Sequence, residues 1–93
     1  MKLLLTLFPR VRAEILRLLF FDPTKERYVS ELVGHSALAL RTVQEELAKL
    51  SALGLITSRK HGKRRYYRAN RGHAAFSHLQ QLVITNATMP DKK

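Results

Sequence analysis

The sequence contains no cysteine, few acidic residues and no long run of apolar residues. Without cysteine there can be no disulfide, thiolate metal site or thiol nucleophile, and the composition favours a cytoplasmic protein. Charges recur every few positions, so no segment approaches the roughly 18 consecutive apolar residues of a membrane span. The opening apolar run is interrupted by Thr6 and ends at Pro9 without a small-residue cleavage site. We therefore expect folded structure there rather than a signal peptide.

Catalytic and metal sites also lack candidate residues at suitable spacings. The four histidines are His35, His61, His73 and His78, and no pair has the i, i+3 or i+4 spacing that lets one helix supply two metal ligands. Ser30 and Ser58 are not accompanied by a base and an orienting group in any recognisable pattern. We predict no enzymatic activity, no metal and no cofactor.

The charge that is present is strongly positive and unevenly distributed. Seventeen Lys and Arg against 7 Asp and Glu give a net charge of +10 in 93 residues, a length that suits one domain. Such an excess serves nucleic acid binding, an anionic surface or solubility, and its distribution separates these. Seven basic residues lie within thirteen positions with no acid among them: Arg59, Lys60, Lys63, Arg64, Arg65, Arg68 and Arg71. This clustering favours contact with nucleic acid.

The hydrophobic periodicity predicts a mainly α fold with a small β-hairpin. We expect four helices. The first covers 9–21, and the second begins at its N-cap Ser30 and loosens at 34–36. The third covers 39–53 and ends at Gly54, and the fourth covers 73–85. A short extended segment is expected at 27–29, and strands at 55–59 and 64–68 flank a turn at 60–63. This is a winged helix-turn-helix order, α-(β)-α-α-β-β-α, spanning 1–86, with a frayed tail over 87–93.

The helix over 39–53 has one apolar side and one polar side. If Val43, Leu47 and Leu50 are buried, a rotation of about 100° per residue turns Arg41 and Glu45 outward. In a helix-turn-helix this face enters the major groove, where Arg bonds guanine and Gln bonds adenine. Glu45 either accepts a hydrogen bond from cytosine or orients Arg41. The predicted base-reading residues are Leu40, Arg41, Thr42, Gln44 and Glu45.

The basic hairpin is expected to act as the wing. Strand alternation sends successive side chains to opposite faces, so some pack their stems on the domain while the tip contacts phosphates. Tyr66 and Tyr67 fall on opposite faces, and the sequence does not decide which is buried. The predicted backbone-contacting residues are Arg59, Lys60, Lys63, Arg64, Arg65 and Arg68.

Several motifs together resemble the arsenic-repressor family of winged-helix regulators over residues 8–84. They are Arg12-Ala13-Glu14-Ile15-Leu16-Arg17-Leu18-Leu19, Val29-Ser30-Glu31-Leu32, Arg41-Thr42-Val43-Gln44-Glu45-Glu46-Leu47 with Leu50, Gly54-Leu55-Ile56, and Arg65-Tyr66-Tyr67-Arg68-Ala69-Asn70. The resemblance implies a dimer that binds double-stranded DNA, with the first and last helices at the dimer interface and the third helix reading an operator.

Three departures from the family pattern matter. Ala37 stands where the turn usually has Gly, and Ala39 stands where the recognition helix usually has a Ser cap worth about 1 kcal/mol. Ser36 could cap instead, with the helix beginning at Ala37. The cysteine pair of the arsenic-sensing members is absent, so that activity is not carried over.

The apolar residues near both ends of the chain have two interpretations. They pack within one chain against the face of Val11, Ile15 and Leu18, or they form a homodimer interface. The predicted interface residues are Leu4, Leu7, Phe8, Phe76, Leu79, Leu82 and Val83.

Two other functions stay open at this point. The fold could serve as a protein-interaction or adaptor module, since some relatives carry it in front of a nucleotidyltransferase domain, or the hairpin could bind RNA. No membrane partner is expected. The sequence does not identify an effector, or decide between repression and activation or between a free-standing regulator and a fragment.

Overall fold

The structure is a computed structural model in which residues 2–89 are described. The elements are α1 (Lys2–Leu7), α2 (Arg10–Phe20), β1 (Arg27–Tyr28), α3 (Val29–Ser36), α4 (Leu40–Ala52), β2 (Ile56–His61), β3 (Arg64–Ala69) and α5 (Phe76–Thr88). The three strands form an antiparallel sheet in the order β1-β3-β2. The prediction of a mainly helical chain with a small hairpin is confirmed, and α1 is an additional helix.

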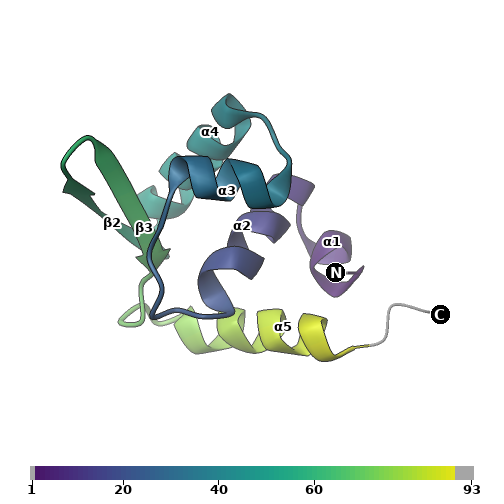
Figure 1. Cartoon of the computed structure of the whole chain (residues 1–93). Coiled ribbons are helices and arrows are strands. Elements are labelled where there is room, and N and C mark those ends of the chain that lie inside the picture. Colours follow the sequence, from purple (N-terminus) through teal and green to yellow (C-terminus); the bar gives the residue numbers. More distant parts are fainter. Residues whose placement is uncertain (1, 90–93) are drawn as a thin grey trace.

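Helix α2 is the centre of the packing, because it contacts α3, α4, α5 and β3. Figure 1 shows α3 and α4 on one side of it, α5 on the other, and the hairpin projecting away from the helices. The sequence indicated an apolar face of Val11, Ile15 and Leu18, and burial extends beyond it to Ala13, Leu16 and Phe20. Each fully buried large apolar side chain contributes about 1.5–3 kcal/mol, so this helix holds much of the stability.

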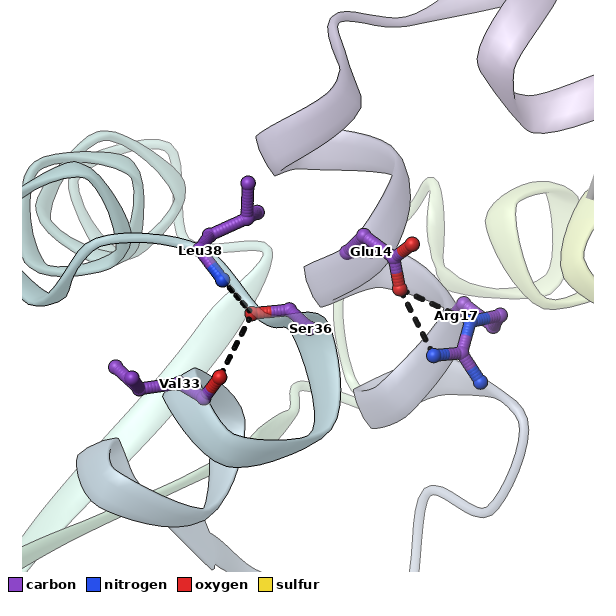
Figure 2. A network of polar contacts seen from close by, with 5 residues as sticks. All are labelled: Glu14, Arg17, Val33, Ser36 and Leu38. Atoms are coloured by element: carbon purple, nitrogen blue, oxygen red, sulfur yellow. Dashed lines mark hydrogen bonds and ion pairs between the residues drawn. The ribbon is translucent and has the colours of Figure 1, made fainter.

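The turn between α3 and α4 depends on a left-handed residue. Ala37 has φ 58°, a left-handed conformation that glycine adopts more readily than alanine. The Ser36 hydroxyl accepts a hydrogen bond from the Leu38 N–H at 3.3 Å and donates to the Val33 carbonyl at 3.5 Å (Figure 2). Helix α4 begins at Leu40, and Ala39 makes no side-chain cap bond. The alternative of a helix that begins at Ala37 is therefore wrong, because Ala37 lies outside the right-handed region.

The start of α3 also differs from the prediction. Ser30 is not the N-cap, because the helix begins at Val29 and its N-cap is Tyr28, two residues earlier than expected. The Tyr28 N–H donates to the Glu31 carboxylate at 3.1 Å, so an acidic side chain in the first turn satisfies this N–H. The helix continues through Gly34 to Ser36 without the loosening that we expected.

The hairpin is longer and its turn is tighter than predicted. Lys60 and His61 belong to β2 rather than to the turn, and His61 pairs with Arg64 across the two-residue turn Gly62-Lys63. Gly62 has φ 63°, which a glycine adopts without strain. Tyr67 packs against the core, and the alternation along β3 places Tyr66 on the opposite face.

Helix α5 joins the two ends of the described chain. It begins at Phe76 and ends at Thr88, so it is shifted by three residues from the predicted 73–85. The expectation of a frayed tail over 87–93 is wrong at its first two residues, Ala87 and Thr88, which continue α5. Asn86, just before them, is 4% exposed and its side-chain oxygen accepts the Leu4 N–H at 3.1 Å. The rest of the expected tail, residues 90–93, lies outside the described residues.

Candidate nucleic-acid interface

The outward side of α4 carries every residue that the sequence predicted as a base reader. Leu40 is 52% exposed, although it is a large apolar residue at the first position of the helix. Arg41, Thr42, Gln44 and Glu45 are also exposed, whereas Val43, Leu47 and Leu50 face the core. The helix therefore presents a mixed apolar and polar surface to solvent over its first two turns.

Arg41 and Glu45 form an exposed ion pair along this face. The Arg41 Nε lies 3.3 Å from a Glu45 carboxylate oxygen, at the i, i+4 spacing. Exposed pairs of this kind contribute only about 0.3–0.5 kcal/mol. Of the two roles that the sequence allowed for Glu45, this contact matches the orientation of Arg41, and the weak pair leaves Arg41 able to exchange Glu45 for another acceptor.

A buried ion pair fixes α4 on α2. Glu46 is 3% exposed, and its carboxylate accepts a hydrogen bond from the Arg12 Nε at 2.6 Å. Sequence reasoning missed this contact. The available signal was an acid on the apolar side of the helix, three residues after Val43, because a buried carboxylate requires a partner. The pair fixes how the outward face of α4 is presented.

The strand register sorts the hairpin residues onto two faces. Tyr67 on the core-facing side is paired with Ser58, and Arg65 on that side donates from Nη1 to the Ser58 hydroxyl at 3.0 Å. The opposite face of the sheet carries Tyr28, Thr57, Arg59, His61, Arg64, Tyr66 and Arg68. All six cations that the sequence predicted for the hairpin are exposed. Three of the six, Arg59, Arg64 and Arg68, lie on the face turned away from the core, Lys60 and Arg65 lie on the core-facing side, and Lys63 lies in the turn.

Two of these arginines are already engaged within the chain. Arg59 donates to both carboxylate oxygens of Glu26, with its closest contacts at 2.8 Å, and its guanidinium lies 5.3 Å from the centre of the Tyr66 ring. The Arg64 guanidinium lies 4.1 Å from the centre of the Tyr28 ring. Hydrogen bonds from Arg59 hold the pKa of Glu26 below its usual range, and Glu26 raises the pKa of Arg59. The acid-free run of residues 59–71 is thus partly neutralised by an acid from another segment.

The remaining cations of the hairpin have no such partner. Lys60, Lys63 and Arg68 form no ion pair or side-chain hydrogen bond among residues 2–89. Charged groups without internal partners stay fully hydrated and can exchange water for an external anion at little cost. The available positive charge of the hairpin therefore lies on these three residues and on Arg64 and Arg65.

Helix and hairpin meet in a shared hollow. It has a volume of about 260 Å³ and lies where the starts of α3 and α4 approach the tip of the hairpin. Leu40 and Gln44 line it from α4, Tyr28 from β1, and Lys63, Arg64 and Arg65 from the hairpin. Two of the predicted base readers and three of the predicted backbone-contacting cations therefore border the same hollow.

The predicted dimer residues do not form one exposed surface. Leu4 and Val83 are 0% and 1% exposed within the single chain, so they belong to its own core. Phe8, Phe76, Leu79 and Leu82 are partly buried against the same core, and the Phe76 ring lies 5.8 Å from the Phe20 ring. Leu7 is 53% exposed, and Leu5, Ile84 and Met89 add to the apolar surface near the two ends of the described chain. An apolar surface remains there, made by a different set of side chains.

His73 has a structural position that the sequence did not reveal. Its Nε2 donates to the Leu53 carbonyl at 3.1 Å, and its Nδ1 accepts the Ala75 N–H at 2.9 Å, so one neutral tautomer satisfies both bonds.

Within the described residues, no three His, Asp or Glu side chains gather as metal ligands. The same part of the chain contains no helix with the length and apolar character needed to cross a bilayer.

Comparison of this chain with protein-family models, with curated proteins and with solved structures gave no match.

Proposed function

We propose that this protein is a winged helix-turn-helix transcriptional regulator that binds double-stranded DNA. In this proposal α4 is the recognition helix and the β2–β3 hairpin is the wing. One observation carries it: two outward residues of α4, Leu40 and Gln44, line the same hollow as three cations at the tip of the hairpin. A surface of this shape and charge suits a duplex, which offers a groove next to a row of phosphates.

The outward face of α4 provides the sequence-reading part of the proposal. The major groove is about 12 Å wide and admits a helix, and guanine and adenine edges accept bidentate hydrogen bonds from Arg and Gln. Arg41 and Gln44 are exposed on the first two turns, where Arg41 is held only by its weak pair with Glu45. Leu40 provides an apolar contact for a thymine methyl group at the same end of the helix.

The hairpin provides affinity that does not depend on sequence. Lys60, Lys63 and Arg68 have no internal acceptor among the described residues, so phosphates can take that place. Each phosphate contact releases counterions, and binding should weaken steeply as salt is added. The net charge of +10 adds long-range attraction to the same partner.

We further propose that the regulator acts as a cytoplasmic homodimer of the arsenic-repressor type. The exposed apolar side chains of Leu5, Leu7, Ile84 and Met89 support association through α1 and the end of α5. Two recognition helices related by a two-fold axis would read half-sites about one helical turn apart. Light scattering of the free protein at several concentrations tests this oligomeric state.

The deciding experiment is selection of bound fragments from genomic DNA, followed by titration of the selected site and a random duplex. Arg41→Ala and Gln44→Ala should each reduce the preference for the selected site by about tenfold and leave binding to random duplex nearly unchanged. Lys63→Ala and Arg64→Ala should weaken both duplexes equally, and each should lower the salt slope by about one if its side chain binds one phosphate.

Arg10→Ala is the matched control, because it removes a cation from the start of α2, beside α1 and away from the hairpin (Figure 1). It should leave both affinities unchanged. Equal losses at α4 and at the hairpin on both duplexes would contradict the division of roles. A chain that stays monomeric and ignores duplex DNA would favour the adaptor function, and tighter binding to competing RNA would favour an RNA partner.

A further inference from the structure

A second hollow lies away from the α4 and hairpin surface. It has a volume of about 360 Å³ and is lined from α2 and the segment after it, from β1 and from the end of α5. This volume falls in the range of roughly 300–1,000 Å³ that small-molecule sites occupy. Its apolar lining comes from Leu18, Phe21, Ala87 and Met89, and Arg17 and Arg27 add two cations.

Two apolar side chains of this lining are exposed to solvent. Phe21 is 58% exposed and Met89 is 46% exposed, although both are large apolar side chains with a packed core nearby. Large apolar groups left in contact with water gain free energy when another apolar group covers them. The two side chains therefore favour a ligand with an apolar body.

Arg27 provides the polar part of the site. It lies in β1 opposite Tyr67, and its Nε is shielded from solvent while no acceptor for it occurs among the described residues. A shielded donor without an acceptor is unfavourable, and a carboxylate binds a guanidinium side-on through Nε and a terminal nitrogen. Because Nε is shielded, side-on binding requires the guanidinium to turn toward the ligand.

The other charged side chains around the hollow are already paired. Arg17 donates to the Glu14 carboxylate at 2.8 Å (Figure 2). Asp22 accepts the Thr24 hydroxyl at 2.7 Å, and this bond holds the pKa of Asp22 below its usual range. Arg27 forms no ion pair among residues 2–89, and its attraction to Asp22 is a minor cause of the lowered Asp22 pKa, so Arg27 is the cation that a ligand anion would neutralise.

We propose that this hollow binds a small carboxylate with an apolar body, with Phe21 and Met89 covering the apolar part and Arg27 binding the carboxylate. The site also offers a route to the hairpin, since β1 pairs with β3 and Arg27 lies in that pairing. This route would make the ligand an effector of duplex binding. That consequence rests on the proposed function, whereas the binding site itself does not.

Calorimetric titration of the full chain with 2-naphthoate and with its neutral amide, 2-naphthamide, tests the site. The two probes have the same apolar body and differ in charge. We expect 2-naphthoate to bind at least about tenfold more tightly, because hydrogen bonds to a charged group are the stronger ones. Arg27→Met should lower the affinity for 2-naphthoate to that for 2-naphthamide and leave the amide unaffected.

Arg68→Met is the matched control, because it removes the same group from the same sheet outside this hollow, and it should leave both affinities unchanged. Ala87→Phe should abolish binding of both probes by filling the hollow, and Ala87 is exposed, so the fold should tolerate the larger side chain. Thermal melts of each variant without probe report folding. If Arg27→Met does not fold, two other results test the site: the tighter binding of 2-naphthoate than of 2-naphthamide by the wild type, and the absence of binding of both probes by Ala87→Phe.

Absence of 2-naphthoate binding, equal affinities for the two probes, or equal effects of Arg27→Met and Arg68→Met would overturn the proposal. Duplex titrations separate its failure from that of the proposed function. Without probe they report duplex binding alone. With 2-naphthoate present they report the coupling between the ligand site and duplex binding. The probe should change the duplex affinity of the wild type and have no effect on that of Arg27→Met.

Discussion

The helical body and the β2–β3 hairpin hold their shapes in different ways. The helices supply almost the whole buried core, and the hairpin contributes only Ile56 and Ala69, both at its base. Beyond the base the hairpin carries cations, half-buried tyrosines and hydrogen bonds between its strands. Substitutions at exposed positions usually change stability by less than about 0.5 kcal/mol. The contrast teaches that stability and binding can be altered separately in this protein, and the following predictions test that separation.

Leu47→Ala should be the most destabilising of these changes. Leu47 is 1% exposed between α4 and the rest of the core, and a Leu→Ala change at such a site costs about 3 kcal/mol through reduced burial and the cavity left behind. Urea unfolding followed by circular dichroism measures the loss. Lys60→Ala in the hairpin is the comparison, and an equal loss there would show that the hairpin is part of the cooperative core.

Arg12→Ala should destabilise the body by about 2 kcal/mol. It leaves the Glu46 carboxylate buried without its partner, and the cost is below that of a fully buried pair because Arg12 is 34% exposed. Arg10→Ala, two residues earlier on an exposed position, should have no measurable effect in the same unfolding experiment. A loss in Arg12→Ala no larger than that in Arg10→Ala would mean that the pair does not hold α4 on α2.

The double change Lys60→Ala and Lys63→Ala should reduce duplex affinity by about tenfold with no loss of stability. Both lysines lack an internal ion-pair partner in the described part of the chain, so each is available to a phosphate. Fluorescence anisotropy at two salt concentrations measures the affinity and its salt slope. Arg59→Ala should cost much less, since Glu26 already neutralises Arg59. Equal losses would contradict this distinction.

Ala37→Gly should stabilise the protein by about 0.5–1 kcal/mol. Ala37 has φ 58°, where an L side chain is strained and glycine is not. The gain is reduced by the greater freedom of glycine in the unfolded chain. Thermal unfolding of this variant should be compared with that of Gly34→Ala, in the interior of α3, which should also be stabilising because alanine favours a helix. A destabilised Ala37→Gly variant would exclude the left-handed turn.

Glu26→Gln should raise duplex affinity by about twofold to threefold, the smallest of these effects, because it frees the partly exposed Arg59. The bonds from Arg59 hold the pKa of Glu26 below its ordinary value. Because the folded-state pKa of Glu26 is lowered, its ion pair with Arg59 is fully formed above the unfolded-state pKa. The pair is lost only as the pH falls through the lower folded-state pKa. The affinity difference between wild type and Glu26→Gln should therefore stay constant from pH 7 to mildly acidic pH. A difference that disappears over that range would contradict the pairing.

Sequence periodicity was sufficient to predict features that depend only on residues a few positions apart. The apolar side of α4 is where Val43, Leu47 and Leu50 predicted it, and Gly54, with φ 75°, follows its end. The sequence left two placements open for Ala37, in the turn or at the start of the next helix, and its φ of 58° selects the turn. Boundaries of one to three residues were missed where a distant side chain decides them. His73, for example, bonds to the end of α4, and α5 begins only after it.

The sequence predicted which residues lie on the candidate surface, but it did not predict which of their charges are neutralised by other segments. The outward positions of α4 and the hairpin cations follow from the 3.6-residue and two-residue periods of helix and strand. The pairing of Arg59 with Glu26, 33 residues apart, does not follow from any period. The burial of Leu4 and Val83 in one core does not follow from a period either, because it depends on α1 packing against α5.

The amino-acid order alone determined which stretches are helical or extended, which side of each is apolar and where positive charge accumulates, because these properties depend on neighbours within a few residues. Folding in three dimensions decided which tyrosine faces the core, which arginines are neutralised, and that α4 and the hairpin tip share one hollow. These outcomes depend on contacts between segments far apart in the chain, and no short-range pattern encodes them.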